Sequence, residues 1–303
     1  MNKLNLVISN EYFMSIKKRS FIFSTIFIPI IFFVLIFIQY YFGSETIDNM
    51  SKTVPEVKTE QITSEDIRVI IALVSTTLLW FFLMFYGAQL FNSVRYEKSN
   101  RIVEIIISSV KPHTFMLGKI IAVGLVGLTQ IFIWLALLFV IILCIASNSI
   151  PTEYAVNQIS IMNLYDALSI LPFGIFSFIG GYLLYGALYA AMGSLLDSDN
   201  DNQSYMAFIT IILMMSMYAG IAVIEQPTGT FAELCTYIPF TSPIILLIRI
   251  VHGIVWWKIL LSYSILFSSC WVSIYISGKI YSAGILLKGK HISISNIISF
   301  IKG

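Results

Sequence analysis

The sequence predicts an all-α membrane protein, organised as a bundle of six transmembrane helices. Of its 303 residues, 58% are hydrophobic and 11% are charged, and the mean hydropathy is +0.87. A soluble domain carries about 25% charged residues, so this chain cannot cover a soluble globule with charge. Its long apolar runs are continuous in Phe, Ile, Leu and Val. The strands of a β-barrel would alternate with period two, so the pattern indicates helices.

Six apolar runs are each long enough to cross a hydrocarbon core about 30 Å thick, which takes roughly 20 helical residues. The first run follows three basic residues, as a signal peptide would, but it is longer than an apolar signal region of about 7–15 residues. No small-x-small cleavage site follows it, so we expect it to remain as a membrane anchor. We predict a single transmembrane domain over 1–303, with a short extracytoplasmic loop at 43–67 and spans at about 20–42, 68–92, 118–147, 168–196, 203–224 and 259–282.

The distribution of basic residues orients the bundle. Thirteen of the 18 Lys and Arg residues lie in the first 19 residues, in 93–119, or from 279 onward. Because cytoplasmic loops carry an excess of Lys and Arg, both termini are predicted to be cytoplasmic. The acidic loop DSDND at 197–201 departs from the pattern, but it lacks the Gly and the terminal Glu of an EF-hand. We therefore favour a solvated turn over a Ca²⁺ loop.

Two segments outside the spans carry further helix signals. Before the first span an apolar residue recurs every fourth position, at Leu4, Ile8, Tyr12 and Ile16. This period predicts an N-terminal interfacial helix, and a disordered basic tail is the alternative. Within 225–258 an apolar stretch reaches Arg249 in too few residues to cross the membrane, which favours an extracytoplasmic re-entrant segment before the last span. A true seventh span, which would place the C-terminus outside, is the alternative.

The sequence offers no catalytic, cofactor-binding or metal-binding site, and we do not expect the chain to be an enzyme. The interiors of the six predicted spans contain no Asp, Glu, Lys, Arg or His, which a membrane-embedded proton relay or metal site would need. GILLKGKH at 284–291 matches GxxxxGK, but His291 stands where a P-loop needs Ser or Thr. A basic patch beside the membrane is the favoured interpretation of that segment.

Small residues recur every fourth position in the stretch GGYLLYGALYAAMGSLL, at Gly186, Ala190 and Ser194. This pattern allows helices to approach closely in a membrane. We favour packing within one bundle over a dimer seam. The same helix carries three tyrosines for which a substrate-lining role is a further hypothesis, Tyr182, Tyr185 and Tyr189.

The polar stretch YEKSNRIVEIIISS at 96–109 lies between two strongly apolar spans. On a helical wheel Glu97, Arg101, Glu104 and Ser108 share one stripe, with isoleucine and valine on the other side. Pro112 limits the helix, because the residue before proline disfavours the α conformation. The pattern predicts a short amphipathic helix that presents charge to the cytoplasm. Glu97, Arg101 and Glu104 could recognise a partner, or they could simply pair with one another on a solvated face.

Several motifs, taken in order, resemble the permeases of ABC-2 type exporters, in the group that includes the sodium-efflux permease NatB. They are YEKSNRIVEIIISSVKPHTFMLGKIIAVGLVGLTQ, GGYLLYGALYAAMGSLLDSDND, IPFTSP, WWK and GKIYSAGILLKGK, and the resemblance covers most of 1–42 and 67–303. It implies a transmembrane subunit that binds no ATP itself and works with a separate ABC ATPase subunit. It also implies a second permease copy or a related permease, surrounded by membrane lipid in the cytoplasmic membrane of a prokaryote. No nucleic acid partner is expected.

In such permeases the loop that matches 96–109 is the coupling helix, which sits in a groove of the ATPase. Carried onto this sequence, the resemblance implies that Glu97, Arg101 and Glu104 contact the ATPase. Secondary candidates for the same contact are Arg95, Lys98 and Asn100.

One feature departs from the group. Permeases of this group often carry a large extracytoplasmic domain between the first two spans, whereas 43–67 is too short to bury a core of its own. The resemblance by itself therefore does not carry the sodium substrate over to this chain. The spans offer no carboxylate, while the chain contains 23 Phe and 16 Tyr, which fits an amphiphilic, lipid-like or hydrophobic peptide cargo better than a naked cation. A membrane scaffold or sensor that binds a cytoplasmic partner is the alternative function, and an ion-driven transporter is disfavoured.

Overall fold

The structure is a computed structural model, and it describes residues 3–19, 21–27, 29–31, 34, 64–100, 109–147, 161–196 and 202–286. Throughout this part of the chain the regular secondary structure is helical, without a strand. The helices are α1 (Lys3–Ile16), α3 (Ser64–Ser99), α5 (Pro112–Ser147), α6 (Ile161–Leu195), α7 (Asn202–Glu225), α8 (Thr230–Tyr237), α9 (Ser242–Val251) and α10 (Trp256–Leu286). The chain is thus an all-α bundle, in agreement with the predicted fold class.

Within the described residues, five helices are long and apolar enough to cross a membrane. They contain the candidate spans Arg68–Ser99, Pro112–Val140, Ser169–Leu195, Tyr205–Glu225 and Trp256–Ile285. The first predicted span, 20–42, lies only partly among these residues, where an apolar helical stretch runs over Phe21–Ile31. The remainder of that span, and most of the predicted loop 43–67, lie outside the described residues; the last four loop positions are already helical in α3.

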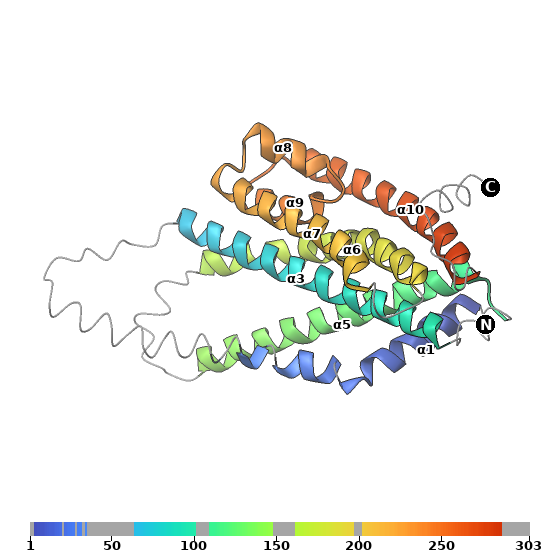
Figure 1. The fold of residues 1–303 in the computed structure, drawn as a ribbon. Coiled ribbons are helices and arrows are strands. Elements are labelled where there is room, and N and C mark those ends of the chain that lie inside the picture. The colour runs from blue at the N-terminus through green and yellow to red at the C-terminus, as the bar shows by residue number, and fades with distance from the viewer. Residues whose placement is uncertain are drawn as a thin grey trace, which may run out of the picture.

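The long helices run alongside one another, and α6 makes its most extensive contacts with α3 and α10 (Figure 1). The start of α1 lies at the same end of the bundle as the ends of α3 and α10 (Figure 1). Following the predicted orientation, we call this the inner end and the opposite end the outer end. The amphipathic α1 lies along α5, where Tyr12 and Thr129 share a hydroxyl–hydroxyl hydrogen bond of 2.8 Å.

Small residues bring α6 close to its neighbours. Gly186 lies beside Leu90 of α3, while Ala190 and Ser194 are completely buried farther along α6. Gly284 of α10 approaches Ser194 so closely that an added Cβ would lie 2.7 Å from its carbonyl oxygen. These positions therefore pack within one chain, between α6 and the helices on either side of it.

At the outer end, the segment between α7 and α10 folds into the two short helices α8 and α9. Every residue of α9 from Ser242 to Arg249 is buried, yet ten helical residues span only about 15 Å, so α9 cannot cross a membrane. The guanidinium of Arg249 is satisfied inside this segment: Nε donates to the Pro227 carbonyl at 3.1 Å and Nη1 donates to Thr236 Oγ1 at 2.8 Å. The buried arginine therefore holds the α7–α8 connection and α8 against α9.

An ion pair ties α8 to the start of α10. The ammonium of Lys258 donates to the carboxylate of Glu233, and both side chains are partly exposed to solvent. This hydrogen bond, together with the positive charge of Lys258, lowers the pKa of Glu233 below its ordinary value. A carboxyl whose pKa is lower in the folded state stabilises the fold above its unfolded pKa.

We predict that the Glu233–Lys258 contact is lost in acid. Its stabilisation is fully present above the ordinary glutamate pKa of about 4.3 and disappears as pH falls through the lower folded pKa. Glu233→Gln should therefore lower the thermal midpoint of the detergent-solubilised protein at pH 7, and this difference should shrink as pH falls below the ordinary glutamate pKa. A difference that keeps the same size at low pH would contradict this assignment.

We predict that Gly87→Ala destabilises the bundle, because the added methyl group collides with the buried ring of Tyr189 where α3 meets α6. Overpacking of this kind typically costs about 1–3 kcal/mol. Gly174→Ala is the matched control, since a Cβ there meets nothing within 4 Å and alanine favours a helix interior by roughly 0.5–1 kcal/mol. Unfolding in a dodecyl sulfate titration should move in opposite directions for the two variants.

Candidate functional site

The candidate coupling segment begins as the last turn of a membrane-spanning helix. α3 runs without interruption from Ser64 to Ser99, which corresponds to about 54 Å and exceeds the hydrocarbon thickness of about 30 Å. No Gly or Pro occurs between 92 and 99, so nothing in that stretch stops the helix at the predicted span end. The first four residues of the predicted amphipathic helix, 96–99, therefore belong to α3, and 101–108 lie outside the described residues.

Glu97 points into the bundle. Its carboxylate accepts a hydrogen bond from the ammonium of Lys119 on α5, and the Glu97 side chain retains 13% of its exposure. Lys119 is completely buried, and it also donates to Ser93 Oγ at 3.0 Å, one turn before Glu97 on α3. The two helices are thus joined by a buried charge pair where each meets the inner end.

A third helix contributes a second carboxylate to this cluster. Oε2 of Glu11 on α1 lies 3.7 Å from the Lys119 ammonium, and the ring centroid of Phe115 lies 5.5 Å from it. One cation therefore faces two carboxylates in a site withdrawn from water, where an unpaired charge is costly. We call Glu11, Glu97 and Lys119 the buried charge cluster.

Two polar atoms near the cluster have no hydrogen-bond partner among the described residues. They are Oε2 of Glu97 and the hydroxyl of Tyr281, a completely buried side chain of α10. Tyr281 is close enough to Glu97 and Glu11 to feel their charges. Helices α1, α3, α5 and α10 therefore all bring polar groups to one junction at the inner end.

Lys98 forms a second connection from the end of α3. Its side chain is only 6% exposed, and its ammonium donates to the carbonyl oxygen of Ser194 at 2.7 Å. Ser194 lies in the last turn of α6, whose unpaired carbonyl groups attract a cation. Consecutive residues at the end of α3 thus bind two different helices, Glu97 binding α5 and Lys98 binding α6.

The remaining predicted contact residues are distributed differently. Arg95 is half-buried, whereas Asn100 is exposed and its side-chain amide donates to the Tyr96 carbonyl at 2.9 Å. Arg101 and Glu104 lie outside the described residues. Of the candidates that the structure describes, Glu97 and Lys98 hold the bundle together, and Asn100 faces solvent at the start of the loop.

Lys119, Glu11 and Tyr281 were not predicted as site residues from the sequence. The expectation that the span interiors lack ionisable groups was based on predicted span ends at 92 and 118. In the structure α3 continues to Ser99 and α5 begins already at Pro112. α5 begins at Pro112, so Lys119 lies about two turns inside the helix. The available signal in the sequence was one charged residue on each side of the segment between α3 and α5, Glu97 and Lys119. Whether these two residues pair depends on how α3 and α5 pack. No group of three metal-binding side chains occurs among the described residues.

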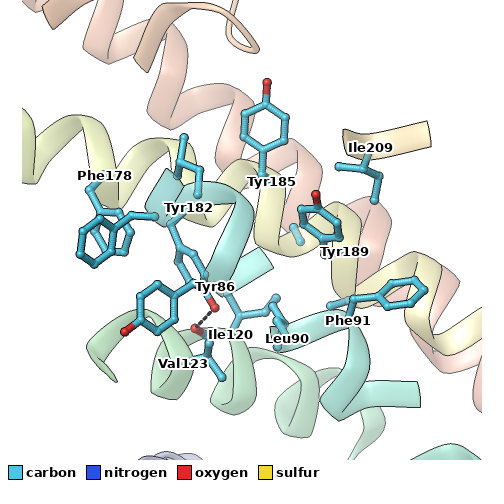
Figure 2. Close-up of a cluster of buried hydrophobic side chains, with 14 of the residues drawn as sticks. Tyr86, Leu90, Phe91, Ile120, Val123, Phe178, Tyr182, Tyr185, Tyr189 and Ile209 are labelled. Atoms are coloured by element: carbon cyan, nitrogen blue, oxygen red, sulfur yellow. Dashed lines mark hydrogen bonds between the residues drawn. The ribbon is translucent and has the colours of Figure 1, made fainter. Parts of the chain in front are cut away.

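Tyrosines fill the centre of the bundle (Figure 2). Tyr182 points from α6 toward α5 and donates to the Ile120 carbonyl at 3.1 Å. Tyr185 donates to the Phe240 carbonyl at 2.8 Å, and the hydroxyl of Tyr189 lies 3.3 Å from Thr210 Oγ1. All three side chains are buried with their hydroxyl groups bonded inside the chain. Their side chains therefore pack as part of the core of the bundle.

Comparison with known proteins agrees with this architecture. A family described as ABC-2 family transporter protein matches residues 46–279, which includes most of the bundle. The chain belongs to the ABC-2 family. Helices α3, α5, α6, α7, α8, α9 and nearly all of α10 fall inside the matched region of this ABC-2 protein.

The curated relatives of the ABC-2 chain are themselves uncharacterized. YhaP of Bacillus subtilis is 27% identical over 218 residues, which is 70% of this chain and 50% of YhaP. A protein of Methanocaldococcus jannaschii is 29% identical over 211 residues, or 69% of this chain and 48% of that protein. The chain thus spans about half the length of the curated relatives it matches. No solved structure matches it.

We predict that Lys119→Met destabilises the fold by about 3–5 kcal/mol, because it leaves two carboxylates buried without their cation. Unfolding in a dodecyl sulfate titration measures the change. Lys111→Met is the matched control, since Lys111 is an exposed lysine eight positions away and its substitution should have little effect. Equal stability of the two variants would show that the buried charge cluster does not stabilise the protein.

Proposed function

We propose that this ABC-2 chain is the membrane-spanning permease subunit of an exporter, driven by ATP that a separate ABC ATPase subunit binds and hydrolyses. The observation that carries the proposal is the continuity of α3. This helix passes from the outer end into the candidate coupling segment at 96–109, where it ends at Ser99. Its last turn is bound to α5 and α6. A force applied to the loop would therefore act on several helices together.

The buried charge cluster supports a rigid transmission of that force. Moving α3 relative to α5 would separate Glu97 from Lys119 and leave the Glu97 carboxylate without this cation, which costs several kcal/mol in a buried site. The Lys98–Ser194 hydrogen bond opposes displacement of α3 from α6 in the same way. Closure of the ATPase would thus move the inner ends of these helices as one body. Arg101, Glu104 and Asn100 are the candidate contacts with the ATPase, and Arg95 is a secondary candidate.

We propose an amphiphilic cargo, such as a lipid-like molecule or a hydrophobic peptide. In the described span residues, the carboxylates are Glu97, held by Lys119, and Glu225, at the exposed end of α7. Neither offers a cation an open site at membrane depth, where a path for ions would need one. Sodium export, which the resemblance to the sodium-efflux group raises, therefore has less support from these residues.

The proposed transporter needs a second permease, either another copy of this chain or a related one. We place it in the cytoplasmic membrane of a prokaryote with both termini in the cytoplasm, as the excess of Lys and Arg on that side predicts. The inner end would then face the ATPase, and the α8–α9 segment would lie on the extracytoplasmic side. Transport from the inner end to the outer end is export.

We predict that reversing both charges of the loop, with Arg101→Glu and Glu104→Arg, abolishes association with the ABC ATPase encoded beside this chain. Reversal replaces each attraction across the interface by repulsion while it keeps the pairing between the two side chains. Co-purification measures association, and ATP-dependent efflux from inverted vesicles measures coupling.

The matched control reverses Glu65→Arg and Arg68→Glu, an exposed pair with the same spacing at the outer end of α3. This variant should bind the ATPase and transport normally. Unchanged association in the loop variant would refute the coupling role. Association without any ATP-dependent transport of a lipid or peptide substrate would instead favour a scaffold that binds a cytoplasmic partner.

A further inference from the structure

Three consecutive basic residues lie where α1 ends and the next helix begins. Lys17, Lys18 and Arg19 follow α1 directly, and the apolar helical stretch Phe21–Ile31 begins two residues after Arg19. All three side chains are exposed. In the part of the chain that the structure describes, none of them forms an ion pair with a carboxylate. We call Lys17, Lys18 and Arg19 the basic corner.

Backbone hydrogen bonds hold the basic corner in a defined turn. The Lys17 amide donates to the Phe13 carbonyl at 3.3 Å, which closes the last turn of α1. The Lys18 carbonyl then accepts from the amides of Phe21 and Ile22, at 3.0 and 3.3 Å, as the next helix begins. The three basic side chains therefore project from an ordered turn, so a ligand that binds them does not have to order the backbone first.

Both helices that meet at the basic corner are fixed to α5. On the α1 side, the hydroxyl groups of Tyr12 and Thr129 share a hydrogen bond of 2.8 Å. On the other side, the indole N–H of Trp134 donates to the Thr25 carbonyl at 3.2 Å. Lys18 is also close enough to the buried charge cluster for its charge to act on a carboxylate there. A ligand held at the basic corner is therefore connected to the packing of α1 on α5.

The helix after the basic corner shows which medium surrounds it. Its polar side chains Ser24 and Thr25 are buried, and both hydroxyl groups donate to the Phe21 carbonyl. Its apolar side chains face outward instead, and these are 45–62% exposed: Ile22, Phe23, Ile26, Phe27 and Ile30. A helix with apolar side chains outside and bonded polar side chains inside is suited to lipid. Acyl chains therefore begin within about one helical turn of Arg19, which places the basic corner at the depth of the lipid phosphates.

The end of α1 adds apolar side chains to the same surface. Phe13 and Met14, about one turn before Lys17, are 57% and 49% exposed. Exposed apolar side chains beside lysine and arginine are typical of helices that rest in the membrane interface and attract anionic lipids. The surface thus offers cations for a phosphate and apolar side chains for the acyl chains beneath it. A soluble anion would use only the cations.

We propose that the basic corner binds the phosphate groups of anionic phospholipids, with Phe13 and Met14 resting against the acyl chains. Three cations without a described ion-pair partner favour a lipid of net negative charge over a zwitterionic one. The bound lipid holds the end of α1 at the membrane surface and so keeps α1 packed on α5. This role belongs to the chain alone, so it does not depend on the proposed ATPase partnership.

The first test uses the full-length protein in nanodiscs of phosphatidylglycerol and phosphatidylcholine in equal amounts. One of the two lipids carries a diazirine at the glycerol end of an acyl chain, and peptide mapping locates its adducts after irradiation. We expect phosphatidylglycerol to label 13–19 at least about tenfold more than phosphatidylcholine does, since each basic residue near the surface contributes about a fivefold preference. Equal labelling by the two lipids, or no labelling of 13–19, would overturn the proposal.

Charge variants provide the second test. Lys17→Gln, Lys18→Gln and Arg19→Gln together should remove the preference for phosphatidylglycerol at 13–19, whereas the charge-conserving set Lys17→Arg, Lys18→Arg and Arg19→Lys should keep it. Arg68→Gln, at an exposed arginine near the outer end, is the control for loss of a positive charge elsewhere and should change nothing at 13–19. A preference that survives in the neutral variant would overturn the proposal. Labelling that inorganic phosphate abolishes would assign the basic corner to a soluble anion and overturn it as well.

Hydrogen exchange tests the effect on α1. In the wild type, the backbone amides of 3–16 should exchange at least about threefold more slowly in the mixed nanodiscs than in pure phosphatidylcholine, because bound lipid opposes the detachment of α1 from α5. The neutral variant should exchange at the same rate in both membranes, and the charge-conserving variant should behave as the wild type does. Equal exchange of the wild type in both membranes would show that anionic lipid does not hold α1.

Discussion

The arrangement of the inner end depends on the burial of one ammonium group. Lys119 is completely withdrawn from solvent, and a buried cation persists only where carboxylates and hydrogen-bond acceptors compensate for its lost hydration. Glu97 and Ser93 from α3 and Glu11 from α1 meet this demand. The cluster therefore favours the observed arrangement of α1, α3 and α5, in which these charges are paired.

The buried charge cluster also changes how the polar stretch at 96–109, which follows the second predicted span, is interpreted. A helix that stopped at the membrane surface would leave a separate short helix free to move on its own. Instead α3 continues to Ser99, and its last turn is bound to α5 through Glu97 and to α6 through Lys98. Residues that resemble partner contacts in the sequence are thus divided, some inside the bundle and some at the start of the loop.

Much of the fold was predictable from hydropathy, because each span is a local property of about 20 consecutive residues. The predicted spans from 68–92 to 259–282 lie within described helices, except that 168–196 passes the end of α6 by one residue. Their ends were less predictable: α3 and α5 extend beyond the apolar runs, because polar residues such as Glu, Lys and Arg continue a helix as readily as apolar ones. At the candidate site, the sequence indicated Glu97 and Lys98 as polar residues of interest, but it predicted exposure where the structure shows burial.

By itself the sequence determined that this chain is a helical membrane protein. It has too few charged residues to cover a soluble globular domain, and its apolar runs are long enough to cross the bilayer. It also carried the motifs that indicate the ABC-2 family. Only the tertiary structure decided that Lys119 meets a carboxylate 22 positions away, that Lys98 reaches a carbonyl 96 positions away, and that α6 and α10 enclose an apolar groove. The hydropathy of a span is a sum over consecutive residues, so the sequence alone determines it. Charge pairing and cavities depend instead on which helix faces are brought together.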